Sequence, residues 1–68
     1  MKLHYYPETD SLYIELRPQS GAESREVAEG VVADFGADGV LVGLDIDNAS
    51  KAFDLSRVET VDLPVAAE

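Results

Sequence analysis

The stretch GVVADFGADGVLVGLDI, residues 30–46, decides the fold of this 68-residue chain. It contains two apolar runs separated by a turn that includes Asp38 and Gly39. An Asp-Gly pair between such runs is a strong signal for a β-hairpin. A two-residue turn predicts the cross-strand pairs Ala37–Val40, Phe35–Val42, Ala33–Leu44 and Val31–Ile46. A four-residue turn beginning at Gly36 would keep the same residues on each face, and only a one-residue slip or a bulge would exchange the faces.

The N-terminal residues predict an earlier hairpin over residues 2–16. Aromatic and aliphatic residues alternate with polar ones on both sides of the turn-forming sequence Pro-Glu-Thr-Asp at residues 7–10. Pairing Tyr6 with Ser11 makes one face of this hairpin apolar and the other polar. The further pairs that this register predicts are Tyr5–Leu12, His4–Tyr13, Leu3–Ile14 and Lys2–Glu15.

The two hairpins are separated by a polar stretch. Residues 17–25 contain Pro18 and Gly21 and predict an irregular connection. The second hairpin is then expected over residues 27–47. After it, Ser50 is a plausible N-cap for a short helix that continues to Arg57.

The C-terminal end leaves two interpretations open. Residues 58–63 form a short apolar run that ends at Pro64, and such a run is compatible with a fifth strand as well as with coil or helix. Residues 65–68 are expected to be frayed.

These elements predict an α+β, mostly β, single domain over residues 1–68: a four-stranded antiparallel sheet made of two hairpins, with a short C-terminal helix packing on one face. The predicted apolar face consists of Leu3, Tyr5, Leu12, Ile14, Leu16, Val31, Ala33, Phe35, Val40, Val42, Leu44 and Ile46. One short helix is a small lid for this surface. A chain of this size has a marginal core, and it has no cysteine for a disulfide, so we expect a homodimer.

Charge restricts the classes of partner. Five Lys and Arg against fourteen Asp and Glu give a formal net charge of -9. This charge repels nucleic acid and anionic membranes and attracts a basic protein, although it also serves simple solubility. The N-terminus lacks the long apolar region of a secretory signal, and no apolar run approaches the ~20 residues of a membrane span. We therefore expect a cytoplasmic protein.

Several segments together resemble the small bacterial domain-of-unknown-function family 2283. The most specific are DSLYIEL at residues 10–16 and VGLDI at residues 42–46, and the similarity covers residues 5–50. Asp45 stands where members more often carry Glu, and Gly36 stands where an acidic residue is common. The resemblance supports the fold and implies no established activity. Because some members are encoded beside small ribonuclease toxins, it also implies an antitoxin-like role.

The outward face of the second hairpin is the candidate contact surface. It combines two apolar residues with three acids, which suits binding to a basic protein, although a solvated sheet face has the same composition. The residues assigned to this surface are Val32, Asp34, Leu41, Asp45 and Asp47. The leading hypothesis is a non-enzymatic protein–protein interaction module, antitoxin-like towards a basic partner such as a small toxin.

A calcium site is the first alternative. Residues 34–45 partly match an EF-hand loop, with carboxylates at Asp34, Asp38 and Asp45. Gly36 supplies no ligand oxygen, the last Asp is shorter than the usual Glu, and the flanks are strand-like where an EF-hand needs helices. The pattern favours a hairpin turn, and no metal ligand is assigned.

Acid–base chemistry is the second alternative. His4, opposite Tyr13 and near the outer acids, is the candidate group. The chain has no second histidine, and no nucleophile is oriented by the pattern. No catalytic or cofactor-binding residue is assigned. The competing hypothesis is thus a ligand- or metal-binding protein, or a small enzyme, that uses His4 and the outer acidic residues.

Overall fold

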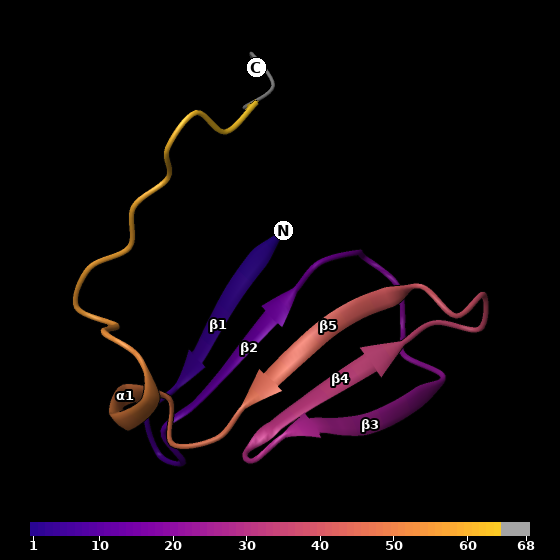
Figure 1. The fold of residues 1–68 in the computed structure, drawn as a ribbon, viewed down its shortest axis with the longest axis horizontal. Helices are drawn as coiled ribbons and strands as arrows, with labels where there is room; N and C mark the ends of the chain where they lie inside the picture. The colour runs from indigo at the N-terminus through magenta and orange to yellow at the C-terminus, as the bar shows by residue number, and fades with distance from the viewer. Residues whose placement is uncertain (65–68) are drawn as a thin grey trace.

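A computed structural model describes residues 1–64 as a five-stranded antiparallel sheet followed by one turn of helix (Figure 1). The elements are β1 (Lys2–Tyr6), β2 (Ser11–Glu15), β3 (Glu23–Ala28), β4 (Val31–Phe35), β5 (Leu41–Ile46) and α1 (Ala49–Ala52). The strands lie in the order β1-β2-β5-β4-β3. The mostly β class and the short helix are confirmed, whereas the prediction of four strands is wrong.

The strand that the sequence did not predict is β3, which begins inside the stretch assigned to the connection. Its sequence ESREVA is mostly polar, and all six residues are exposed. An edge strand has only one neighbour and tolerates charged side chains on both faces, so it shows no apolar alternation. It pairs with β4 across a turn in which Gly30 adopts a φ of 76°, and a bulge lies between Glu26 and Ala28.

The first hairpin is confirmed in every predicted pair, from Lys2–Glu15 to Tyr6–Ser11. Its turn ends at Asp10, which adopts a left-handed φ of 54°. The Asp10 carboxylate accepts hydrogen bonds from the Tyr5 hydroxyl at 2.7 Å, and from the N–H and hydroxyl of Ser50 at 3.1 and 2.8 Å. These bonds, the one from Tyr5 first, hold the pKa of Asp10 below its ordinary value.

The second hairpin differs from the predicted register at its turn and agrees with it further along the strands. The Gly36 N–H donates to the Val40 carbonyl at 2.9 Å and encloses three residues, the last of which, Gly39, has a φ of 81°. This is the three-residue loop that ends in a left-handed residue. Its odd length shifts the register by one, so Phe35 pairs with Leu41 instead of Val42. A bulge at Val42 shifts the register back.

Beyond the bulge, the predicted pairs Ala33–Leu44 and Val31–Ile46 are confirmed. Val42 is the extra residue, and its side chain is completely buried. Its carbonyl accepts hydrogen bonds from the N–H groups of Leu16 and Arg17, at 2.8 and 3.2 Å. The bulge is therefore fixed by the segment that leaves β2.

Residues paired across an antiparallel sheet share a face, so the pairing defines two surfaces. The apolar face contains Leu3, Tyr5, Leu12, Ile14, Val31, Ala33, Phe35, Leu41, Leu44 and Ile46, with Glu23 and Arg25 at its β3 edge. The outer face contains Lys2, His4, Tyr6, Ser11, Tyr13, Glu15, Ser24, Glu26, Val32, Asp34, Gly43 and Asp45. The turn thus places Leu41 on the apolar face, contrary to prediction.

The C-terminal segment differs most from expectation. Helix α1 has four residues, and Ser50 lies inside it rather than capping it; the residue before the helix, Asn48, has a φ of 51° and makes no side-chain cap. The predicted N-cap is wrong because the Ser50 hydroxyl donates to Asp10. Phe53 is extended, with φ -138° and ψ 159°, and ends the helix well before the predicted limit.

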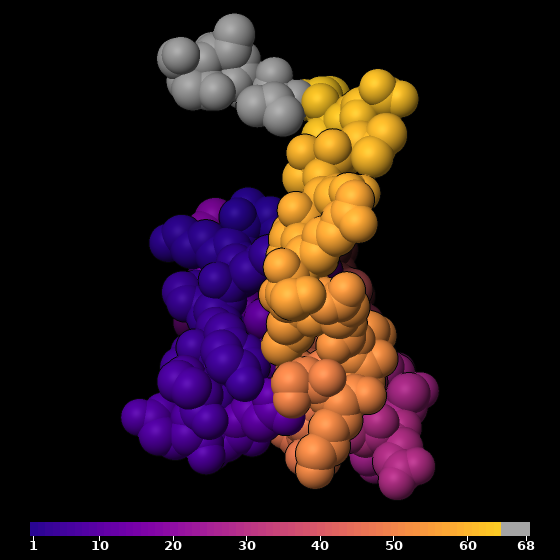
Figure 2. Space-filling model, turned by 90° about the vertical axis from the view of Figure 1, so that its left-hand side faces the viewer, coloured from indigo at the N-terminus to yellow at the C-terminus, as the bar shows by residue number. Residues whose placement is uncertain are grey.

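After α1, the chain is irregular. Residues 58–63 form no strand, so that alternative is wrong. This segment extends away from the sheet (Figures 1 and 2). The fraying predicted for residues 65–68 lies outside the described residues.

The sheet is a single layer with a small core. Among the described residues, the buried apolar ones are Ala33, Val42, Ile46 and Ala49, and the shortest dimension is 19 Å. Helix α1 contributes only Ala49 to this core, so it does not form the lid predicted for the apolar face. Within residues 1–64, no helix is long and apolar enough to span a membrane.

Candidate functional site

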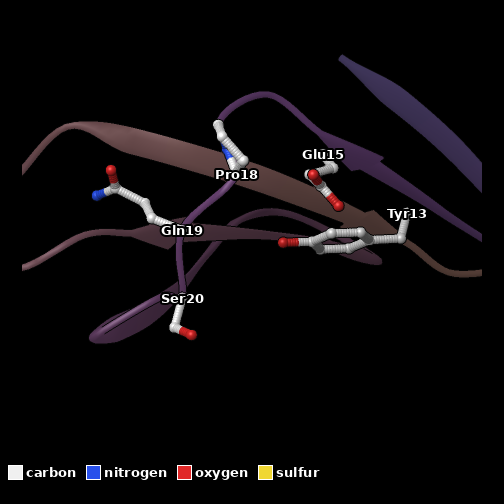
Figure 3. A pocket seen from close by; sticks show the side chains of 5 residues that line it. All are labelled: Tyr13, Glu15, Pro18, Gln19 and Ser20. Carbon is white, nitrogen blue, oxygen red and sulfur yellow. The ribbon is translucent and has the colours of Figure 1, made fainter.

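The connection between β2 and β3 folds over one end of the outer face and forms an open depression of about 330 Å³ (Figure 3). The lining residues are Tyr13, Glu15, Pro18, Gln19 and Ser20. Figure 3 shows the Tyr13 hydroxyl pointing toward the connection, with Glu15 beside the ring. The depression offers a carboxylate, an amide, hydroxyls and an aromatic surface.

Tyr13 reaches across the sheet because Gly43 has no side chain. Its ring lies directly over Gly43 of β5, where a Cβ atom would collide with the hydroxyl and the ring. The hydroxyl donates to Asp34 on β4 at 3.3 Å, and Ser24 on β3 donates to the other oxygen of Asp34 at 2.6 Å. One line of side chains from β2, β4 and β3 thereby spans four strands, crossing β5 over Gly43.

Burial and charge keep the Tyr13 hydroxyl in its neutral form. Partial burial raises the pKa of the Tyr13 hydroxyl, and the neighbouring carboxylate of Asp34 raises it further. Tyr13 therefore remains a neutral donor at physiological pH. Asp34 accepts hydrogen bonds from two donors in the fold, Tyr13 and Ser24, and is therefore held in place.

A second acid on the outer face, Asp45, has a raised pKa. Loss of hydration on the sheet raises the pKa of Asp45, and the like charges of Asp47 and Asp34 raise it further. Asp45 pairs directly with Val32 on β4. None of the ion pairs found within residues 1–64 includes any of these three acids.

The structure brings together most of the predicted contact residues. Val32, Asp34 and Asp45 share the outer face, and Asp47 follows β5 with its N–H donating to the Gly30 carbonyl at 2.8 Å. Leu41 does not join them, because it pairs with Phe35 on the apolar face.

The side chains of the connection were not predicted as part of a site. Pro18, Gln19 and Ser20 indicated a loop, and nothing in the sequence says which face a loop covers. Gly43 is the one available signal, since a glycine within a strand often marks the close approach of another group.

The two alternative chemistries gain no specific support. His4 lies with Nε2 3.8 Å from the Glu15 carboxylate, and its side chain is 44% exposed. The stretch from Asp34 to Asp45 forms a hairpin between two strands, as predicted, and not an EF-hand. In the described part of the chain, no three His, Cys, Asp or Glu side chains are grouped so as to hold a metal ion.

Comparison with known proteins gives one match. The family model described as "Protein of unknown function (DUF2283)" matches residues 2–50, a range that includes all five strands and ends within α1. This confirms the resemblance of the DSLYIEL and VGLDI segments. No curated protein and no solved structure matches the chain.

Proposed function

We propose that this chain, which belongs to the family Protein of unknown function (DUF2283), is a non-enzymatic protein–protein interaction module of the bacterial cytoplasm. Its outer face binds a basic protein, in the manner of an antitoxin that holds a small toxin. The observation that carries the proposal is the group of Asp34, Asp45 and Asp47 around Val32, in which loss of hydration, and then repulsion from Asp47 and Asp34, raise the pKa of Asp45.

A cationic partner would relieve this repulsion. A Lys or Arg side chain near Asp45 favours its charged form, so binding turns an unfavourable local charge into a favourable contact. Val32 supplies an apolar contact at the centre of the group. The formal charge of -9 increases the rate of encounter with a basic protein.

The neighbouring depression fits the same partner chemistry. An arginine side chain could place its planar guanidinium on the Tyr13 ring and hydrogen-bond to the Glu15 carboxylate. The amide of Gln19 and the hydroxyl of Ser20 complete the polar rim. The contact surface therefore extends from Asp47 along the outer face to the connection.

Charge reversal tests the proposal. The Asp45→Lys/Asp47→Lys variant should lose a basic protein that the wild-type chain captures from the lysate of its native host, as measured by quantitative mass spectrometry. The matched control, Glu8→Lys/Glu59→Lys, makes the same charge change in the first turn and in the segment after α1, and it should retain the partner. Circular dichroism checks the fold of both variants. Equal capture by both variants, or no basic protein captured by the wild type, would contradict the proposal.

A further inference from the structure

The apolar face of the sheet is not completed by the chain itself. Leu3 and Tyr5 on β1 are 52% and 46% exposed. Leu12, Ile14, Val31, Phe35, Leu41 and Leu44 are only half-buried. Residues that pack edge to edge within one layer lose part of their exposure, but their tips stay in water until a second layer covers them.

The total surface gives a measure of what is missing. The chain exposes 5304 Å². A compact monomer of 7.3 kDa exposes about 4,200 Å², so roughly 1,100 Å² is in excess. A stable protein–protein interface removes about 800 Å² from each partner, and homodimers remove more. The excess comes from the uncovered sheet face together with the extended segment after α1 (Figure 1), and its size is of the order that one subunit contributes to a dimer.

We propose that a second copy of this chain covers the apolar face, sheet against sheet. The charges favour this face for self-association. Its charged strand positions are Glu23 and Arg25, which lie 3.5 Å apart, and the Arg25 guanidinium stacks 4.1 Å from the centre of the Phe35 ring. The face is thus nearly neutral, while the outer face is acidic. Two chains of charge -9 avoid like-charge contact only by meeting through the neutral surface.

The arrangement is self-complementary. In a two-fold dimer, the same patch of each copy meets its counterpart, so aliphatic side chains face aliphatic side chains and the Glu23–Arg25 pair lies at the polar rim. Two sheets packed in this way lie about 10 Å apart. This interface is independent of the proposed function, because it leaves the outer face of both copies open.

Sedimentation equilibrium of the full chain tests the inference. The wild type should have twice the 7.3 kDa chain mass at micromolar concentration. Ile14→Lys places a charge at the centre of the face and should give a monomer. Leu3→Lys changes a side chain that is already half exposed, so it should keep the fold and weaken dimerisation more than tenfold. His4→Lys introduces the same residue on the same strand but on the outer face, and it should leave the dimer intact.

Two further readouts separate the possible results. Circular dichroism identifies a variant that fails to fold, in which case Leu3→Lys decides the question. Salt should strengthen the dimer, because it screens repulsion between two acidic chains, whereas it should weaken binding of a basic partner. A monomeric wild type, or equal weakening by Leu3→Lys and His4→Lys, would overturn the proposed interface and leave the proposal for the outer face untouched.

Discussion

The apolar face and the outer face use alternate residues of the same strands, but only the outer face is partly covered by the chain itself. The connection after β2 covers one end of the outer face, and the line from Tyr13 through Asp34 to Ser24 ties its strands together. The apolar face has aliphatic side chains without a covering layer. The comparison indicates that hydrogen bonds between side chains can satisfy a polar sheet face within one layer, whereas an apolar face needs a second layer to exclude water.

The largest loss of stability on the outer face is expected from adding a side chain at Gly43, beneath the Tyr13 ring. Gly43→Ala should destabilise the fold by on the order of 2 kcal/mol, because the added Cβ collides with the Tyr13 ring. Urea unfolding measures the loss. In the Tyr13→Ala background, the same glycine substitution should have little further effect. If the two losses were additive instead, the close approach of Tyr13 would not explain the glycine.

A smaller loss is expected from the end of the same line. Ser24→Ala removes a 2.6 Å hydrogen bond to Asp34 and should cost about 1 kcal/mol by urea unfolding. Ser56→Ala is the matched control, since it removes a serine–aspartate bond of 2.5 Å that lies within the segment after α1. The control should not change global stability. A loss as large as that of Ser24→Ala would show that the cross-strand line has no special weight.

The smallest change in stability is expected at Asp45, whose charged form the fold disfavours. The pKa of Asp45 is raised above its ordinary value of 3.8, so the folded state binds this proton more tightly than the unfolded state. Stability therefore falls as the pH rises through the folded pKa. Asp45→Asn should add about 0.5 kcal/mol at neutral pH, or about 3 °C in melting temperature, and the gain should vanish below pH 3.8.

Thermal melting at neutral and acidic pH checks this prediction. Glu29→Gln, an equal charge change in the turn between β3 and β4, is the control and should show a smaller gain. If Asp45→Asn lowered the melting temperature at neutral pH, the acid would stabilise the fold and the need for a cationic partner would lose its basis.

Local patterns predicted the first hairpin completely. Its alternation and turn fix one register, and no distant group is needed. The second hairpin was predicted only in part, because the bulge at Val42 depends on the N–H groups of Leu16 and Arg17, which are distant in sequence. The three-residue turn pairs Leu41 with Phe35 and so sets the face of Leu41, and the bulge restores the predicted faces beyond it. In physical terms, the alternation of apolar and polar residues assigns side chains to the two faces of a sheet, and a bulge held by distant hydrogen bonds can change that assignment.

The other errors have the same origin. The edge position of β3 allows a polar sequence that resembles a loop. Ser50 has the chemistry of an N-cap, but the Asp10 carboxylate, 40 residues earlier, accepts its hydroxyl. For the candidate site, the common face of Val32, Asp34 and Asp45 followed from strand alternation. The covering connection did not, because loop direction is set by tertiary contacts.

The most direct test of the contrast between the faces is an isotope-filtered NMR experiment on a mixture of labelled and unlabelled full-length chains. It detects only contacts between methyl groups of different copies. We predict intermolecular contacts from Ile14, Leu41 and Leu44 on the apolar face, and none from Val32 on the outer face. Contacts from Val32, with none from those three residues, would contradict the assignment of self-association to the apolar face.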